Sequence, residues 1–393
     1  MADGDRMDIA ITHLSLNFRG GEERLCLSFI KALKSGGHRV TLSTIERTDW
    51  HSLIDIFGSV VKPDAENYPT SATMHTELAK ASTVALAYAN YLAELLKLKS
   101  SRRYDLVINT YGDLFNSIAD VAYVHFPITA TIDYAQTPAF VSPAKWMIYC
   151  RTYNMMALVL DNIKPSFLLT NSKFTQQVVR KYLKRDAIIL HPPVDVHKYT
   201  SKRVKRENYV ITISKFTPKR HLYKIPLIAK RTRDAEFVII GEADEYSSGT
   251  IENLRTLISK CGVEDRVTLK TNVPRLELIE LLGKAKAYLH VMPFDHFGIS
   301  IVEAMSAGCI PILHRSGGPW LDILGQQQGQ IGFSYDTLEE AARLIDHVMA
   351  AEDVRLELSS AAEKSALRYD ESVFRENLNE IVDGLVSGNG RMR

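Results

Sequence analysis

The sequence predicts an α/β protein made of two consecutive doubly wound domains. Short apolar segments typical of buried strands alternate with amphipathic helix patterns along most of the chain. This alternation stops at a segment with two prolines and then a basic run, residues 188–208, and restarts afterwards. The chain has 393 residues, about two to three times the size of a common single domain. We therefore expect two Rossmann-like parallel-sheet domains that face a central cleft, where a ligand would bind.

The first domain opens with a strand–helix–strand unit. Segment 7–14 predicts a strand, and after a glycine-containing turn segment 22–37 shows a helical spacing of apolar side chains. Those apolar positions are Leu25, Cys26, Phe29, Ile30 and Leu33. Because segment 38–44 predicts the next strand, the two strands are expected to be parallel. Beyond this unit we predict a long helix over 73–99 and strands over 104–110, 121–127 and 166–172.

The second domain repeats the alternation. Strands are predicted over 209–215, 236–242, 266–272, 287–293 and 310–315. Helices are predicted between them, over 222–232, 249–262, 275–285 and 300–308. The resulting division is a first domain over 1–200, a second over 207–368 and a C-terminal segment over 369–393. Its amphipathic helix is expected to return to the first domain before a mobile tail.

The composition is that of an ordinary globular protein. Hydrophobic residues make up 46% and charged residues 24%, and the net charge of +2 does not favour a nucleic acid partner. Neither a transmembrane helix nor a signal peptide is expected, because apolar runs are short and the N-terminus carries acidic residues. The four cysteines are far apart, which favours buried thiols in a reducing, cytoplasmic environment and no metal site.

The segment "FDHFGISIVEAMSAG", residues 294–308, holds two carboxylates eight positions apart between a predicted strand and helix. Backbone N–H groups at the start of that helix, from His296 through Phe297 and Gly298 to Ile299, are suited to a phosphate or sugar oxygen. Glu303 could accept hydrogen bonds from a ribose diol, and Asp295 from a second ring. The layout therefore suits a nucleotide-sugar. The alternative is that Asp295 is a helix N-cap and Glu303 a surface residue.

Two cations follow an earlier strand of the same domain. Lys215 and Arg220 lie in "ISKFTPKRHL", a loop at a predicted strand end. Fixed cations there would stabilise the charge that develops on a diphosphate leaving group. A solvated basic loop is the alternative, since Lys219 and His221 are also present.

Weaker signals come from three other turns. Gly20 and Gly21 precede a helix, although they do not form a dinucleotide-binding fingerprint. His125 ends a predicted strand and could be a structural histidine as well as a ligand-binding one. Gly317 and Gly318 would let the backbone approach a ligand, and a plain turn explains them equally well.

Taken in their order along the chain, these motifs resemble those of the retaining GT-B glycosyltransferases of the large family four. "RGGEERLCLSFIKALKSGGHRVTL" resembles the opening loop and helix of that family, and "NSKFTQQVV" with "ILHPPVD" the segment before its linker. Lys215 and Arg220 take the places of its Arg and Lys pair in exchanged order. Asp295 and Glu303 take the places of its Glu-x7-Glu motif, with aspartate for the first glutamate.

Within that family, "YVHFP", "HFGISIVEAMSAG" and "HRSGGPWLDIL" are most similar to the ALG-type α-1,2-mannosyltransferases of lipid-linked oligosaccharide assembly. The resemblance implies that Glu303 binds ribose and Asp295 the transferred sugar, with His125 near its far side. It also implies a set of diphosphate-binding groups: Lys215, Arg220, Gly20, Gly21 and the backbone of Phe297 and Gly298. Aspartate is one methylene shorter than glutamate, and the Lys/Arg exchange alters the geometry of the donors.

The function implied by this resemblance is retaining, metal-independent transfer of α-mannose from GDP-mannose to a polyprenyl-linked glycan of N-glycosylation. No cofactor is expected apart from the nucleotide-sugar co-substrate. The leaving phosphate would help to deprotonate the acceptor. Three alternatives stay open: a UDP-sugar donor with a soluble acceptor, a GT-B sugar-nucleotide epimerase or hydrolase, and a nucleotide-binding module without activity.

A lipid-linked acceptor would bring the protein to the cytoplasmic face of a membrane as a peripheral protein. Two first-domain segments suit surface attachment. One is the basic helix end with Lys97, Lys99, Arg102 and Arg103, and the other is the aromatic and basic segment 139–160, which includes Lys145, Trp146, Tyr149, Arg151, Met155 and Met156. The alternative is a solvated basic cap and a core helix.

Overall fold

The structure of the chain is a computed structural model. It describes residues 6–69, 81–134, 144, 146–148, 150–151, 167–200, 205–243 and 247–386, with only the backbone described for 81–86 and 386. The chain forms two compact units, Met1–Pro193 together with Ser372–Arg393, and Val194–Glu371. The division falls inside the segment in which the sequence indicates a linker. Val194 and Tyr199, just beyond it, are buried in the core of the second unit.

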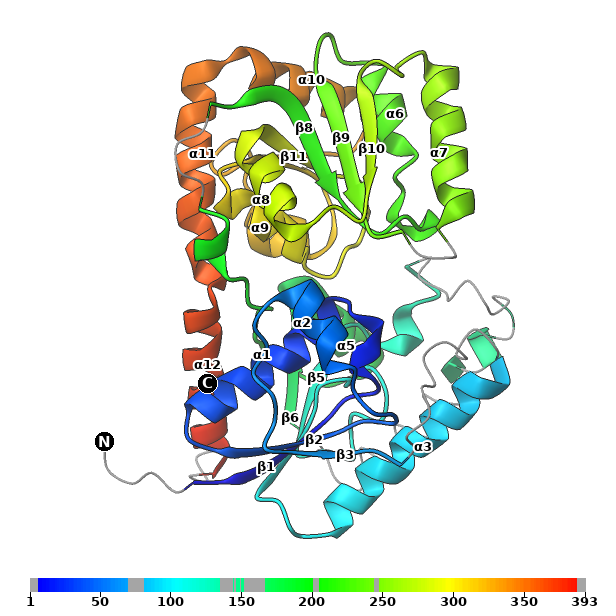
Figure 1. The fold of residues 1–393 in the computed structure, drawn as a ribbon, viewed down its shortest axis with the longest axis vertical. Coiled ribbons are helices and arrows are strands. Elements are labelled where there is room, and N and C mark those ends of the chain that lie inside the picture. The colour runs from blue at the N-terminus through cyan, green and yellow to red at the C-terminus, as the bar shows by residue number, and fades with distance from the viewer. Residues whose placement is uncertain are drawn as a thin grey trace. The chain divides into compact units, whose positions relative to one another are not determined.

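The first domain contains a seven-stranded parallel sheet in the order β3-β2-β1-β4-β5-β6-β7 (Figure 1). Its strands are β1 (Asp8–Thr12), β2 (Arg39–Ser43), β3 (Ala65–Asn67), β4 (Leu106–Asn109), β5 (Val121–Val124), β6 (Phe167–Thr170) and β7 (Ile188–Ile189). The strand order reverses between β1 and β4. In doubly wound sheets, ligands bind beyond the carboxyl ends of the strands at this switch point.

Helices cover both faces of the first sheet. They are α1 (Gly21–Ser35), α2 (Trp50–Phe57), α3 (Ala81–Ser100), α5 (Lys173–Tyr182) and α12 (Glu371–Val386), with short 3-10 turns at Leu16–Phe18 and Ile128–Ala130. The five apolar positions predicted for α1 are all buried against one face, and α3 covers the other face. The predicted long helix is present from Ala81 onward; its first predicted residues, 73–80, lie outside the described part of the chain.

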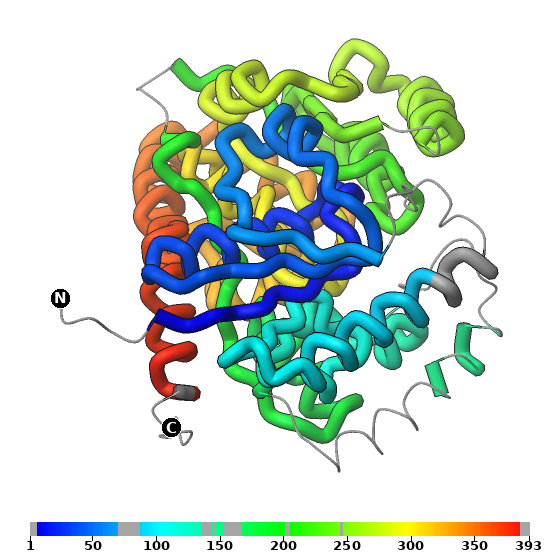
Figure 2. Tube along the Cα trace, turned by 60° about the horizontal axis from the view of Figure 1, so that its bottom comes forward, coloured from blue at the N-terminus to red at the C-terminus, as the bar shows by residue number. Residues whose placement is uncertain are grey.

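The C-terminal helix α12 belongs to the first domain. Phe374, Leu378, Ile381 and Val382 are buried in the same cluster as the apolar face of α1. In Figures 1 and 2, α12 (red) lies beside the N-terminal segment of that domain (blue). Two distant parts of the sequence therefore complete one hydrophobic core. Residues 387–393, predicted as a mobile tail, lie outside the described residues.

The second domain contains a six-stranded parallel sheet in the order β10-β9-β8-β11-β12-β13. Its strands are β8 (Glu207–Ile213), β9 (Glu236–Gly241), β10 (Val267–Thr271), β11 (Ala285–His290), β12 (Ile310–His314) and β13 (Phe333–Tyr335). The switch point lies between β8 and β11. All five strands predicted in this half are present, so the prediction of two doubly wound parallel sheets is confirmed.

Helices of the second domain also lie on both faces of its sheet (Figure 1). They are α6 (Lys224–Ala229), α7 (Ser248–Cys261), α8 (Arg275–Lys284), α9 (Ile299–Ser306), α10 (Leu338–Ala350) and α11 (Glu352–Ala366). Shorter turns are η4 (Val196–Lys198), η5 (Pro218–Arg220), the π-helical η6 (Pro319–Ile323) and η7 (Leu367–Tyr369). Alternate strand residues face α6, α7 and α10 on one side and α8 and α9 on the other.

None of the described helices is long and apolar enough to cross a membrane. At the predicted basic end of α3, Lys97 pairs with Glu94, Lys99 pairs with Asp120 and Arg103 lies over the ring of Tyr104. Most of the second candidate segment, including Lys145, Tyr149, Met155 and Met156, lies outside the described residues. Trp146 is described, and its indole N–H donates to Thr131 Oγ1 at 2.8 Å from a buried position.

Candidate functional site

The predicted cations and acids of the second domain follow two neighbouring strands. Lys215 and Arg220 come after β8, and Asp295 comes after β11, on the two sides of the switch point. Arg220 Nη1 lies 4.0 Å from Asp295 Oδ2 and 3.1 Å from Met292 Sδ. The fold thus brings together an arginine and an aspartate that are far apart in the sequence.

Asp295 is held from several sides. His290 Nε2 lies 2.9 Å from Asp295 Oδ2, and the His296 N–H donates to Asp295 Oδ1 at 2.8 Å. Burial alone would raise the pKa of Asp295, but the hydrogen bond from His290 and the charges of His290 and Arg220 hold this pKa well below its usual range. The alternative interpretation of Asp295 as the N-cap is wrong, because Gly298 caps α9.

The turn between Asp295 and α9 needs a glycine at position 298. Gly298 has a φ of 92°, and a Cβ there would lie 2.4 Å from Ile301 Cδ1. Gly318 donates its N–H to Asp295 O at 2.8 Å, and a Cβ on Gly318 would lie 2.1 Å from His296 O. Gly317 and Gly318 therefore let the loop that follows β12 pack closely against the backbone of the turn at Asp295. This packing accounts for both glycines without a ligand.

Glu303 lies on α9 but is not a surface residue. Only 6% of it is exposed, and its neighbours Val302 and Ala304 are fully buried. The Tyr199 hydroxyl donates to Glu303 Oε1 at 2.5 Å. Because a buried carboxylate is costly unless it is hydrogen-bonded, this contact accounts for an acid in an otherwise apolar helix. The alternative interpretation of Glu303 as a surface helix residue is wrong.

Lys215 is placed differently from Arg220. Its ammonium lies 3.6 Å from Glu242 Oε2, just beyond the end of β9, and 45% of its side chain is exposed. The solvated-loop alternative therefore describes Lys215 as it stands, whereas Arg220 turns toward the end of β11. Both cations nevertheless come from the loop that follows β8.

A second polar cluster lies at the switch point of the first sheet. His13 follows β1 and Thr110 follows β4, and His13 Nδ1 lies 3.0 Å from Thr110 Oγ1. The predicted residue His125 follows β5, and its Nε2 lies 2.9 Å from the Thr110 carbonyl oxygen. Because a carbonyl oxygen can only accept, Nε2 of His125 carries the proton in this contact. Burial lowers the pKa of His125.

The turn at Gly20 is tied to this cluster. The Gly20 N–H donates to Glu23 Oε2 at 2.6 Å, and Glu23 Oε1 lies 3.6 Å from His13 Nε2. Burial alone would lower the pKa of His13, but Cys26 and Glu23 raise it to about 10. Gly20 is the N-cap of α1 and Gly21 its first residue. Both glycines therefore open the helix as the sequence predicts, next to a histidine that sequence reasoning missed.

A buried aspartate supports the His125 turn. Asp113 Oδ1 accepts from the N–H groups of His125 and Phe126 at 2.6 and 2.9 Å. Burial, with a contribution from the charge of Glu22, raises the pKa of Asp113 well above its usual value. The missed residues His13, Thr110 and Asp113 share one signal that could have revealed them, since each follows a strand at or near the switch point.

Residues 195–365 match the family described as glycosyl transferases group 1. The second domain is a group 1 glycosyltransferase domain. The match begins next to Val194, where the second unit begins, and it contains Lys215, Arg220, Asp295 and Glu303.

Curated relatives that match part of this chain carry one common name, "GDP-Man:Man(3)GlcNAc(2)-PP-Dol alpha-1,2-mannosyltransferase". The protein from Dictyostelium discoideum is 26% identical over 262 residues, 61% of this chain and 51% of that protein. The Neurospora crassa protein is 27% identical over 329 residues, 70% and 58%. The Homo sapiens protein is 31% identical over 214 residues, 50% and 44%. The chain spans about half the length of the curated relatives it matches.

Solved structures share the fold of this chain at lower sequence identity. The Anabaena protein HepE, solved with UDP-glucose, has a TM-score of 0.72 at 17% identity and covers 96% of this chain and 100% of its own. Sucrose-phosphate synthase from Thermosynechococcus elongatus has a TM-score of 0.75 at 13% identity, with 98% and 100% covered. The predicted GT-B fold is confirmed by these likenesses and by the two parallel sheets.

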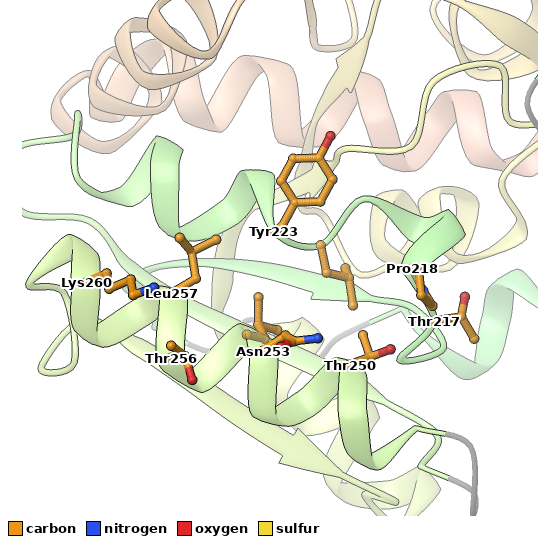
Figure 3. Close-up of a pocket in the computed structure, with 10 residues that line it drawn as sticks. Thr217, Pro218, Tyr223, Thr250, Asn253, Thr256, Leu257 and Lys260 are labelled. Atoms are coloured by element: carbon orange, nitrogen blue, oxygen red, sulfur yellow. The ribbon is translucent and has the colours of Figure 1, made fainter.

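The glycosyltransferase domain also has a pocket of about 450 Å³ beside α7 (Figure 3). Tyr223 stands on one side of it, and Thr250, Asn253 and Leu257 of α7 face it from the other. None of the predicted site residues lines this pocket, although Thr217 and Pro218 belong to the loop that carries Arg220. Within the described chain, no group of three or more His, Cys, Asp or Glu side chains is arranged to hold a metal ion.

Proposed function

We propose that the chain is a retaining glycosyltransferase that transfers α-mannose from GDP-mannose to a polyprenyl-linked glycan. The observation that carries this proposal is the approach of Arg220 to Asp295 at the switch point of a group 1 glycosyltransferase domain. A cation and an acid at one strand edge suit the two ends of a sugar diphosphate. The choice of mannose, guanine and a lipid-linked acceptor follows the name of the curated relatives.

In this proposal Lys215 and Arg220 bind the diphosphate. Arg220 is half-buried and directed toward the end of β11, while the exposed Lys215 would leave Glu242 to meet the ligand. The backbone N–H groups from His296 to Ile299, at the start of α9, would contribute further donors. As the glycosidic bond breaks, these fixed positive groups would stabilise the charge on the leaving diphosphate.

Asp295 would bind hydroxyl groups of the transferred sugar. A carboxylate has about four acceptor positions, so contacts with His290, Arg220 and the His296 N–H leave room for a sugar hydroxyl. Glu303 would bind the ribose hydroxyls of the nucleotide. In the first domain, His125 would lie near the far side of the sugar, and Gly20 and Gly21 would supply backbone donors to the diphosphate.

The proposed reaction breaks the bond between the anomeric carbon and the diphosphate oxygen. A new bond forms between that carbon and an acceptor hydroxyl oxygen on the same face of the sugar, so the anomeric configuration is retained. The hydroxyl proton passes to an oxygen of the departing phosphate. A polyprenyl-linked acceptor would bring the protein to the cytoplasmic face of a membrane as a peripheral protein.

Nucleotide binding tests the donor part of this proposal. GDP should raise the melting temperature more than UDP at equal concentration, since only a bound nucleotide stabilises the folded state. Glu303→Gln should abolish most of that shift. Glu357→Gln, which changes an exposed glutamate of α11 in the same domain, is the matched control and should keep the shift. A larger shift with UDP would replace guanine by uracil in the proposal.

Transfer itself is tested with labelled GDP-mannose and a polyprenyl-diphosphate oligosaccharide, followed by linkage analysis of the product. We expect an α-linked mannose on the glycan that depends on added acceptor. Release of free mannose or of an isomerised nucleotide-sugar without acceptor would identify a hydrolase or an epimerase instead. No turnover, with intact GDP binding, would argue for a nucleotide-binding module.

A further inference from the structure

Glu303 is held in place by a tyrosine from another part of the domain. The Tyr199 hydroxyl lies 2.5 Å from Glu303 Oε1, although the two residues are 104 positions apart in the sequence. Tyr199 is fully buried and packs in the same cluster as Ile301 and Val302 of α9. The ring is therefore fixed by packing, and its hydroxyl fixes the carboxylate.

Arg275 sets the direction of this hydrogen bond. Arg275 Nη2 lies 2.6 Å from the Tyr199 hydroxyl oxygen, and the guanidinium carbon lies 5.4 Å from the centre of the tyrosine ring. A guanidinium group can only donate, so the tyrosine oxygen accepts from Arg275 and gives its own proton to Glu303. The ring face adds a cation–π attraction that keeps Arg275 over the tyrosine.

The three residues come from three separate elements. Tyr199 ends η4, soon after the start of the second unit; Arg275 opens α8, after β10; and Glu303 lies on α9, after β11. A packing contact for α9 alone needs only an apolar partner. A directed arginine–tyrosine–glutamate chain is instead suited to holding one carboxylate in one orientation.

We propose that Tyr199 and Arg275 are positioning residues that orient the Glu303 carboxylate for the ribose hydroxyls of the donor nucleotide. The inference rests on the proposed function of Glu303. A carboxylate that is already oriented loses less conformational freedom when the nucleotide binds, so the chain increases affinity without touching the ligand. Tyr199 and Arg275 act through Glu303 and are not catalytic residues.

Tyr199→Phe tests this role because it removes the hydroxyl and keeps the ring. The affinities of GDP and of 2′,3′-dideoxy-GDP are measured by calorimetry for the native chain and for the variant. We expect the variant to bind GDP about fivefold to thirtyfold more weakly, as for the loss of one to two kcal/mol of interaction. Binding of dideoxy-GDP should change by less than about twofold, because that nucleotide lacks the hydroxyls that Glu303 would hold.

Tyr209→Phe is the matched control. Tyr209 is also buried in this core, and its hydroxyl donates to the Leu281 carbonyl oxygen at 2.5 Å, so the variant loses a buried hydroxyl without affecting Glu303. It should bind both nucleotides as the native chain does. Arg275→Gln gives a second test should Tyr199→Phe fail to fold, and it should weaken GDP binding selectively in the same way. Circular dichroism checks folding in each case.

Two different failures can be told apart. If the native chain binds GDP and dideoxy-GDP equally, or binds neither, the ribose role of Glu303 fails and this inference fails with it. If the native chain prefers GDP and Tyr199→Phe keeps that preference, the inference alone is overturned. An equal loss of both nucleotides in Tyr199→Phe would show a merely structural role. In steady-state assays, a raised KM for the donor with an unchanged kcat is the supporting result.

Discussion

The ring of His290 contacts the carboxylate of Asp295, with 2.9 Å between His290 Nε2 and Asp295 Oδ2. His290 is the last residue of β11, and its carbonyl oxygen accepts from the Tyr335 hydroxyl at 2.9 Å. The acid in the turn is therefore fixed to the sheet through a buried histidine and not to the start of α9. This arrangement ties the geometry of the turn to the stability of the domain.

Asp295→Asn should destabilise the protein at neutral pH by roughly 1–3 kcal/mol, because the charged carboxylate loses its close contact with His290 and its attraction to the Arg220 guanidinium. The folded pKa of Asp295 is depressed, so its contribution is present above the unfolded value of about 3.9 and is lost as the pH falls below it. The difference between native and variant should thus be constant from pH 7 to 5 and shrink below about pH 4. Urea unfolding at each pH measures it.

Asp353→Asn is the control for this experiment. Asp353 is an exposed aspartate of α11 in the same domain, and its replacement should change the free energy of unfolding by less than about 0.5 kcal/mol at every pH. A native–variant difference for Asp295→Asn that stays the same from pH 7 to 3.5 would contradict the charged role of the pair.

The loop at Gly318 lies so close to the turn at His296 that adding one methyl group there should lower the free energy of unfolding. In Gly318→Ala the new Cβ would lie 2.1 Å from His296 O, so the backbone of one loop must shift, at a cost of roughly 1–3 kcal/mol. Gly249→Ala is the matched control, since a Cβ there meets nothing within 4 Å and the residue lies in α7. It should leave stability unchanged or raise it by up to about 1 kcal/mol. Thermal unfolding compares the two variants. Equal melting temperatures for Gly318→Ala and Gly249→Ala would contradict the prediction.

Much of the fold could be predicted because apolar residues recur at regular spacing in its longer helices and strands. The helix face of α1 and the apolar strands β8 to β12 are read directly from spacing. The strands β3, β7 and β13 were not predicted, since they have only 3, 2 and 3 residues and show no alternation. All three are edge strands. Pairing with the neighbouring strand, more than their own sequence, makes these residues extended.

The site could be predicted only where its residues share a short segment. Asp295 and Glu303 stand out because a turn and a helix start lie between them. Tyr199 and His290 could not be singled out, because their importance lies in contacts that the fold creates, and His13 carried only the signal of a polar residue after a strand. Tyr199 meets Glu303 across 104 positions and His13 meets Thr110 across 97. For Gly317 and Gly318 the sequence left a ligand-binding loop and a plain turn equally open, and the close backbone packing against residues 294–297 accounts for both glycines.

The return of α12 to the first domain predicts where a mutation in that helix acts. Leu378→Ala should cost roughly 2–5 kcal/mol, because the fully buried leucine packs in the core of the first domain. Hydrogen exchange followed by mass spectrometry should show lost protection in β1, β2 and α1 and unchanged protection in β8 to β12. Glu376→Ala, on an exposed position of the same helix, should change neither. Lost protection centred on the second sheet would assign the helix to the other core.

His314, at the end of β12, predicts a loss of stability in mild acid. Burial chiefly, and then the positive charge of Lys224, lowers its pKa to about 4, with smaller effects of His290 and His221 in the same direction and of Asp336 in the opposite one. An unfolded histidine titrates near pH 6.5, so between about pH 6.5 and 4 the unfolded chain binds more protons than the folded one. Stability therefore falls as the pH is lowered through that window.

His314→Gln removes this titration and can keep a hydrogen bond to Ser316, whose Oγ lies 2.8 Å from His314 Nδ1. The variant should lose less stability than the native chain between pH 7 and 4.5 in urea unfolding. His197→Gln, which changes an exposed histidine of the same domain, is the matched control. Parallel pH profiles for the native chain and His314→Gln would contradict this prediction. They would mean that neither burial nor Lys224 lowers the pKa of His314 in the folded domain.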